Sequence, residues 1–253
     1  MNDKITVLNF DQIYYRQPFL EDYFCEWIDL ESIPHTNLFC DKDALLHVNS
    51  RLKQRKSGKI TLLGSGNYHY VSSLLLSHIE KPFTLILFDH HTDAFKSPSE
   101  TVISCGSWVF EALDQLPMLK KVIMFGVNEN WQNQIPLKYN EKITAYSEKD
   151  LHENFLSIMG SLRAQIPTES VYLSIDKDVL NTGEAITAWD HGTMTLAELT
   201  KIVEDIIQNK EVSGVDICGE YPINPSNEFK KETREAIKKN QYANQYILDS
   251  LVG

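Results

Sequence analysis

Short apolar runs rich in β-forming residues recur along the chain, and longer segments with helical periodicity separate them. The apolar runs predict strands at residues 5–10, 60–63, 83–88, 121–127, 170–175 and 212–218. The periodic segments predict helices at residues 43–55, 70–78, 108–116, 148–165, 196–209 and 229–251. Because the strands are almost entirely apolar, helices are expected on both faces of the sheet. The predicted fold class is therefore α/β, a three-layer α/β/α sandwich with a mostly parallel central sheet, in which residues 1–253 form one domain.

The composition of the chain argues against several classes of partner and of site. The chain carries a formal net charge of −11, which argues against a nucleic-acid partner and is compatible with cationic substrates. No run approaches the roughly 20 apolar residues of a membrane span, and the first residues lack the apolar run of a signal peptide. The four cysteines form no CxxC pair, so neither a zinc knuckle nor a thioredoxin-like site is indicated. We therefore expect a cytoplasmic protein with reduced thiols and with no membrane or nucleic-acid partner.

Polar residues gather at or beyond the carboxyl ends of four of the predicted strands. Open parallel sheets bind ligands beyond the carboxyl ends of their strands, so these positions are the first candidates for a functional site. In chain order they are His69, then Asp89, His90, His91 and Asp93, then Asp176 and Asp178, and finally Asp216 and Glu220.

The spacing of these residues favours a metal site. Asp89, His91 and Asp93 are two residues apart, so an extended chain points all three to one side, and the same rule brings Asp176 and Asp178 together. Converging acids repel one another unless they are paired or bind metal, and two divalent cations balance the charge of four aspartates. Carboxylate and imidazole ligands suit Mn²⁺, with Asp89 and Asp178 as natural bridges. Two ions about 3.5–4 Å apart can share one water molecule and lower its pKa, which makes it a nucleophile at neutral pH.

Three stretches carry a resemblance to a known family. DHHTD (89–93), SIDKD (174–178) and GSGNYHYVS (64–72) resemble the signatures DAHxD, SxDxDxxDP and GGDHS of the arginase/agmatinase (ureohydrolase) family. The first match is almost letter for letter, with His90 in place of alanine, and the last depends mainly on His69. The three stretches occur in the family's order, each after a predicted strand. The chain therefore resembles an atypical member of this family.

The resemblance implies an arginase-like sandwich that holds two Mn²⁺ ions per chain. One ion would be bound by His69, Asp89, Asp93 and Asp178. The other would be bound by Asp89, His91, Asp176 and Asp178. Asp93 would also orient the attacking hydroxide. Because members of the family usually oligomerise, the resemblance also implies a homo-oligomer.

Departures from the family pattern affect the expected catalytic residues. Cys105, in ISCGSWV, stands where many members have a histidine that shuttles protons, so Cys105 and His191 are both candidates for that role. Glu220 is the candidate carboxylate for a planar guanidinium, although a gap-free alignment puts Gly219 at that position. The asparagine-containing loop that grips the α-carboxylate of free arginine is missing after Asp93. A larger substrate, such as arginine within a peptide, does not need that grip.

The expected function is hydrolysis of a guanidino group by a binuclear manganese enzyme, which releases urea and leaves an amine. The missing grip favours arginine within a peptide, which would become ornithine. Free arginine, agmatine and formimidoyl compounds are alternative substrates of the same kind of site. A different class of function is a catalytically silent subunit that binds a guanidino ligand, although all six expected metal ligands are present.

Overall fold

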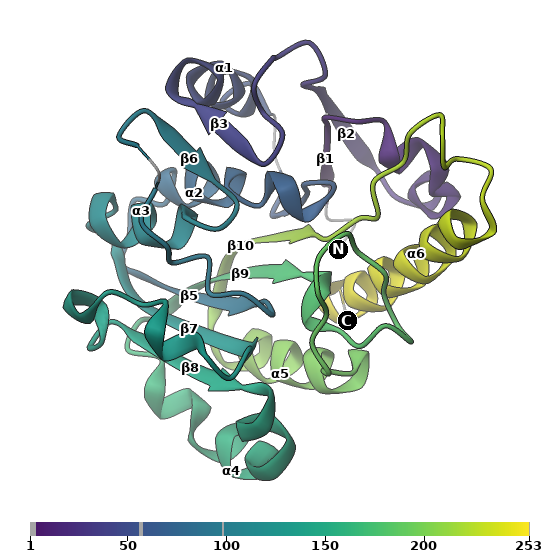
Figure 1. Ribbon diagram of the computed structural model, residues 1–253. Coiled ribbons are helices and arrows are strands. Elements are labelled where there is room, and N and C mark those ends of the chain that lie inside the picture. The colour runs from purple at the N-terminus through teal and green to yellow at the C-terminus, as the bar shows by residue number, and fades with distance from the viewer. Residues whose placement is uncertain (1–3, 56–57, 98, 253) are drawn as a thin grey trace.

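The computed structural model describes residues 4–55, 58–97 and 99–252. The strands are β1 (Ile5–Asn9), β2 (Cys25–Asp29), β3 (Phe39–Asp41), β4 (Ile60–Leu62), β5 (Phe83–Phe88), β6 (Val102–Ser104), β7 (Leu119–Val127), β8 (Ile143–Ser147), β9 (Ser170–Asp176) and β10 (Glu211–Cys218). Within the described residues, eight of these strands form one parallel sheet in the order β2-β1-β4-β10-β9-β5-β7-β8 (Figure 1). β3 and β6 pair with each other in an antiparallel ladder outside that sheet. The carboxyl ends of the eight parallel strands therefore open at one edge.

Helices cover both faces of the large sheet. They are α1 (Lys42–Leu52), α2 (Val71–Ser77), α3 (Trp108–Gln115), α4 (Glu148–Gln165), α5 (Leu196–Asn209) and α6 (Lys231–Val252). Side chains of α1, α2 and α3 share one buried apolar cluster with the sheet, and side chains of α4, α5 and α6 share a second cluster on the opposite face (Figure 1). The predicted three-layer α/β/α sandwich is confirmed.

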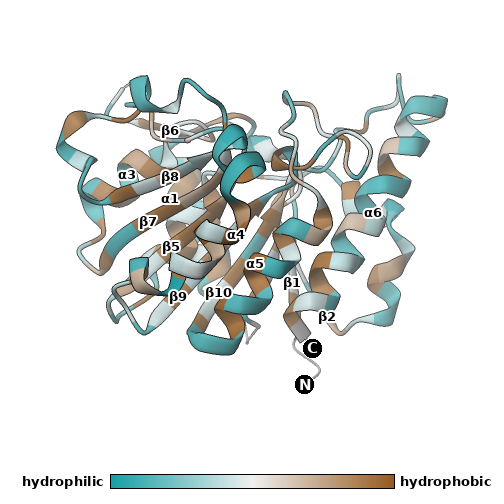
Figure 2. Ribbon diagram, turned by 90° about the horizontal axis from the view of Figure 1, so that it is seen from below, coloured by the Kyte–Doolittle hydropathy of each residue, from teal (hydrophilic) through white to brown (hydrophobic). Residues whose placement is uncertain are grey.

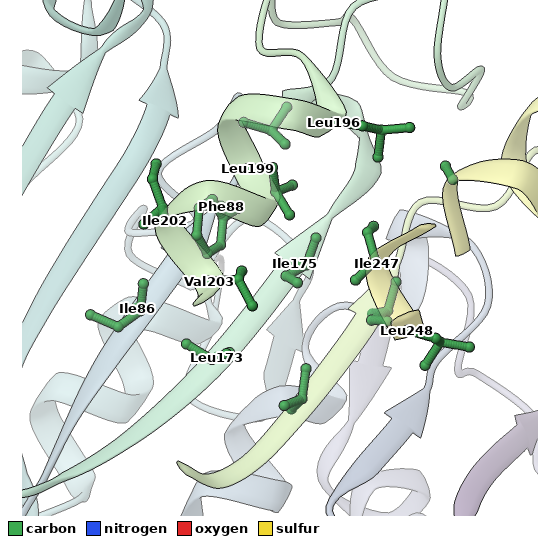
Figure 3. Packing of buried hydrophobic residues seen from close by; sticks show 14 of the residues in the cluster. Ile86, Phe88, Leu173, Ile175, Leu196, Leu199, Ile202, Val203, Ile247 and Leu248 are labelled. Carbon is green, nitrogen blue, oxygen red and sulfur yellow. The ribbon is translucent and has the colours of Figure 1, made fainter. Parts of the chain in front are cut away.

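Alternate side chains of the central strands enter the two clusters. Ile86 and Phe88 of β5 and Leu173 and Ile175 of β9 lie on the face covered by α5 (Figure 3). Figure 2 shows the apolar strands between helices whose outer surfaces are largely hydrophilic. Burial on both faces explains why these strands read as nearly continuous apolar runs. Across residues 4–55, 58–97 and 99–252, we find no helix with both the length and the apolar content needed to span a bilayer.

Two helices on the same face begin with capping boxes. At the start of α5, the Glu198 amide donates to the Thr195 hydroxyl (3.2 Å) and the Thr195 amide donates to the Glu198 carboxylate (2.9 Å). Ser147 and Asp150 form the same arrangement at the start of α4. Each cap stabilises its helix by about 1 kcal/mol and fixes the point at which the chain enters it.

Four strands were not predicted from the sequence. β2 and β8 are the two edges of the large sheet, and their half-exposed side chains produce no continuous apolar run. β3 and β6 have only three residues each, too few to show a period. These strands lie outside the central part of the sheet, so their omission did not alter the predicted fold class.

Candidate metal centre

Six imidazole and carboxylate side chains converge at the carboxyl edge of four adjacent strands, β4, β10, β9 and β5. They are His69, Asp89, His91, Asp93, Asp176 and Asp178. His69 follows β4 after the short 3₁₀ helix η3 (Gly66–Tyr68), three of the others follow β5, and the last two lie at the end of β9 and just beyond it. The structure thus brings together all six residues that were predicted as metal ligands.

One corner of the cluster is centred on His69. Its Nδ1 atom lies 3.1 Å from Asp93 Oδ2, 3.3 Å from Asp89 Oδ2 and 3.6 Å from Asp176 Oδ2. All four side chains are buried. These four side chains would therefore separate a cation bound among them from bulk water.

The second corner is centred on His91. Its Nδ1 atom lies 3.0 Å from Asp178 Oδ2 and 3.5 Å from Asp89 Oδ1. Asp89 thus directs one carboxylate oxygen towards each histidine. This is the arrangement that a bridge between two ions requires, as was predicted for Asp89.

The structure corrects the expected positions of Asp176 and Asp178. Asp178 was expected to serve both ions and Asp176 only the ion of His91, but Asp176 lies beside His69 while Asp178 lies beside His91. The reason is a turn: directly after Asp176 the chain enters the 3₁₀ helix η6 (Lys177–Val179), and the Asp178 amide donates to Asp176 Oδ1 (3.0 Å). The extended alternation assumed from the sequence therefore ends at Asp176.

The electrostatics of the cluster fit a pair of divalent cations. Burial and the neighbouring Asp89 carboxylate raise the pKa of Asp93 to about 7, and burial raises the pKa of Asp178 well above its ordinary value. These shifts mean that four carboxylates cannot all remain ionised here without compensating positive charge. Nitrogen and oxygen donors of this kind suit hard to borderline divalent metals. The residues present therefore fit two metal ions.

A hydrogen-bonded chain behind His69 fixes the tautomer of its ring. The Ser174 hydroxyl donates to Asp216 Oδ1 (2.7 Å), so it accepts the proton of His69 Nε2, which lies 2.9 Å away. With the proton of Nε2 held by Ser174, Nδ1 is the ring nitrogen that His69 can offer to a cation among the three carboxylates. Asp216 was noticed in the sequence without a role, and Ser174 was missed. The alternation along β9, which puts Ser174 and Asp176 on the same side of the strand, was the signal available for Ser174.

Asp93 is held in an unusual conformation by α3. Its φ of 49° lies in the left-handed region, which aspartate adopts more readily than most residues. Trp108 Nε1 donates to Asp93 Oδ2 (2.6 Å), and the Val109 amide donates to the Asp93 carbonyl (3.0 Å). Trp108 is therefore a site residue that the sequence did not reveal, since no pattern distinguished it from a packing tryptophan.

A cavity of about 280 Å³ opens above the cluster. Its floor includes Asp89, Asp93, Asp176 and Asp178, and an apolar wall comes from Leu38, Phe39, Phe95 and Trp189. Among the described residues that line it, no lysine or arginine is present. The cavity can therefore accept a cationic group over the carboxylates, with neutral or apolar surroundings further out.

Cys105 lines this cavity, as a proton-shuttling residue must. Burial raises the pKa of the Cys105 thiol to about 12, so the group stays protonated at neutral pH and exchanges its proton slowly. We therefore expect Cys105→Ser to retain kcat within about threefold of the unmodified protein, a change of less than 1 kcal/mol in the barrier. Steady-state rates of product release measure this. A loss of a hundredfold or more would show that the thiol does transfer the proton.

His191 lies outside the cavity. Its Nδ1 atom donates to the Leu180 carbonyl (2.9 Å), and its Nε2 atom accepts from the Thr187 amide (3.0 Å). Both ring nitrogens therefore stabilise the loop that precedes α5. The expected proton-shuttling role of His191 does not fit this position.

Glu220 is also absent from the cavity wall. It is buried against Lys177, with which it forms an ion pair, and its Oε2 accepts from Gln17 Nε2 (2.6 Å). Both carboxylate oxygens are therefore engaged inside the protein. The expectation that Glu220 binds the substrate guanidinium is corrected by this placement.

The sequence model of the arginase family matches residues 28–239, a span that contains every residue of the cluster. The chain belongs to the arginase family. Arginase-family proteins are metal-dependent hydrolases of guanidino and amidino groups. A Thermotoga maritima protein of uncharacterized function is 32% identical over 218 residues, which cover 85% of this arginase-family chain and 79% of the relative.

Solved structures of other proteins share this fold. A formimidoylglutamase from Bacillus subtilis superposes with a TM-score of 0.69 at 15% identity, covering 98% of this chain and 86% of the other. An arginase from Bacillus cereus gives a TM-score of 0.65 at 16% identity, with 97% and 98% covered. The proclavaminate amidino hydrolase of Streptomyces clavuligerus gives a TM-score of 0.68 at 13% identity, covering 98% of this chain and 92% of the other. At these identities the similarity shows the shared arginase fold.

Proposed function

We propose that this arginase-family protein is a manganese-dependent hydrolase that releases urea from an arginine side chain within a peptide and leaves ornithine. The observation that carries the proposal is the cavity itself. Its floor is formed by His91 and the four aspartates of the cluster, and its described wall contains no cationic side chain. Family membership supplies the class of reaction.

The contacts indicate which residues would hold each ion. His69, Asp89, Asp93 and Asp176 surround one position, and Asp89, His91 and Asp178 surround the other. When bound, two divalent cations supply a water molecule of lowered pKa as the nucleophile. The carboxylate of Asp93 is held by Trp108 and would orient the attacking water molecule towards the carbon of the guanidinium. The apolar wall excludes bulk water from the reacting groups.

The wall also supports a peptide substrate. Free arginine brings an α-carboxylate, and a formimidoylated glutamate brings two carboxylates, but the described wall offers neither a lysine nor an arginine to pair with them. Phe39 and Phe95 are 48% and 52% exposed, which is high for phenylalanine in a cavity wall. A peptide that covers these two rings on binding gains apolar contact and carries no free carboxylate next to the reacting side chain.

The test is urea release by protein that has been stripped of metal and reloaded with Mn²⁺. Free arginine, agmatine and an arginine-containing peptide with blocked termini are compared at equal concentration. We expect urea from the peptide at a kcat/KM at least about tenfold above that for free arginine, which corresponds to about 1.4 kcal/mol of preference. Urea from a small guanidine alone would overturn the peptide assignment. No urea from any of the three, with two Mn²⁺ bound, would overturn guanidino hydrolysis altogether.

A further inference from the structure

A buried lysine lies directly behind the metal centre. Lys177 stands between Asp176 and Asp178 in the chain, yet its side chain is 0% exposed and points away from the cavity. Its ammonium forms an ion pair with Glu220 and donates to Asn244 Oδ1 (2.8 Å). A buried ammonium is costly unless it is paired and hydrogen-bonded, so this position is specified by its partners.

The partners of Lys177 form a closed network. Asn244 Nδ2 donates to Glu220 Oε1 (2.7 Å) and to Gln17 Oε1 (2.8 Å), and Gln17 Nε2 donates to Glu220 Oε2 (2.6 Å). The four side chains are at most 2% exposed. Every carboxylate and amide oxygen of the network accepts at least one hydrogen bond, so the network is rigid. We call these four residues the anchor network.

The anchor network connects distant parts of the chain to the metal centre. Asn244 belongs to α6, and Gln17 lies between the 3₁₀ helices η1 (Ile13–Arg16) and η2 (Pro18–Asp22). Glu220 follows β10. Its neighbour Gly219 packs so closely on the centre that a Cβ atom there would lie 2.5 Å from Asp176 Oδ1. The turn that carries Asp176 is therefore fixed from behind by the two ends of the chain.

We propose that Lys177 and Glu220 are positioning residues of the metal centre, through which the docking of α6 sets the affinity for the two metal ions. Lys177 fixes the backbone of the turn, and with it the directions of Asp176 and Asp178 on either side. Asn244 transmits the position of α6 to that turn. The inference rests on the metal centre and is independent of the substrate proposed above.

The direction in which Lys177→Met changes the affinity for Mn²⁺ distinguishes a positioning role of Lys177 from a purely electrostatic one. Lys177→Met removes a positive charge close to the cations and leaves Glu220 as an uncompensated negative charge. By charge alone, the variant should bind Mn²⁺ more tightly than the unmodified protein. If Lys177 acts by positioning, the turn relaxes and the variant binds Mn²⁺ more weakly.

Calorimetric titration of the metal-free protein with Mn²⁺ gives the affinity without any need for activity. We expect Lys177→Met and the charge-neutral double variant Lys177→Met/Glu220→Gln to bind Mn²⁺ about 10–100-fold more weakly, the range for residues that orient metal ligands. The control is Lys210→Met. Lys210 donates to the Thr168 carbonyl (2.8 Å) beside the amino-terminal end of β9, so its loss should leave Mn²⁺ binding unchanged. Circular dichroism verifies that each variant is folded.

Asn244→Ala tests the link to α6 if the lysine variants fail to fold. It keeps the Lys177–Glu220 ion pair and removes only the hydrogen bonds that Asn244 makes from α6 to the anchor network. We expect Mn²⁺ binding at least about threefold weaker than in the unmodified protein, for the same reason. Affinity within twofold of the unmodified protein, in the folded double variant or in Asn244→Ala, would overturn the proposal. Tighter binding by Lys177→Met would also overturn it and would assign Lys177 a purely electrostatic effect.

Discussion

Asp89→Asn is expected to abolish hydrolysis and to prevent the binding of two metal ions. The two carboxylate oxygens of Asp89 lie 3.3 Å from His69 Nδ1 and 3.5 Å from His91 Nδ1, so this residue serves both corners of the centre. Asparagine keeps the shape but offers one neutral oxygen in place of two charged ones. Losing several kcal/mol of metal-derived stabilisation lowers the rate by about 10³-fold or more.

Two measurements check this result: the rate of urea release, and the metal content after dialysis against Mn²⁺. The control is Asp114→Asn, since Asp114 is an exposed carboxylate of α3 that pairs with Lys138. The control should keep both the full rate and two Mn²⁺ per chain. If Asp89→Asn also kept both, the cluster would not be the metal centre.

Gly219→Glu is expected to destabilise the protein and to weaken metal binding, although it restores the acid that family members carry in a gap-free alignment. Gly219 has a φ of 88°, which disfavours any other residue. A Cβ atom there would lie 2.5 Å from Asp176 Oδ1 and 2.7 Å from the backbone nitrogen of Lys177, closer than real contacts allow. Backbone strain alone costs about 1–3 kcal/mol, and relief of the overlap must displace the turn.

Gly160→Glu is the matched control for this substitution. Gly160 lies within α4, and a Cβ atom there meets nothing within 4 Å, so glutamate should be neutral or slightly stabilising. Thermal unfolding of the metal-free proteins and Mn²⁺ titration compare the two variants. A Gly219→Glu protein as stable as the control, with faster urea release, would show that the position accepts a substrate-binding carboxylate.

Local patterns in the sequence were sufficient to bring the candidate metal ligands together at one site. Parallel strands end at one edge, so His69, Asp89, His91 and Asp93 could be assigned to a common site from their positions after predicted strands. This assignment needed only the common direction of the parallel strands, which the sequence pattern specifies.

Contacts that depend on turns and on long-range packing could not be predicted. The 3₁₀ turn after β9 determines which histidine Asp176 approaches, and no pattern in the sequence predicted that turn. Glu220 was misassigned because its partners, Gln17 and Asn244, lie far away in the chain and become neighbours only when α6 docks. A carboxylate in a sequence motif carries no sign of whether it faces a cavity or a buried lysine.

The small ladder of β3 and β6 has a consequence for how such a protein can diversify. Phe39 pairs with Ser104 in this ladder, and the Cys105 amide donates to the Leu38 carbonyl (3.2 Å), so one side of the cavity mouth is built from two joined loops outside the eight-stranded sheet. The metal ligands, in contrast, are carried by the large sheet and its strand ends. The loops that form this side of the cavity mouth can therefore change during evolution, and with them the range of substrates that can enter. The metal ligands on the large sheet, and the reaction that they support, need not change.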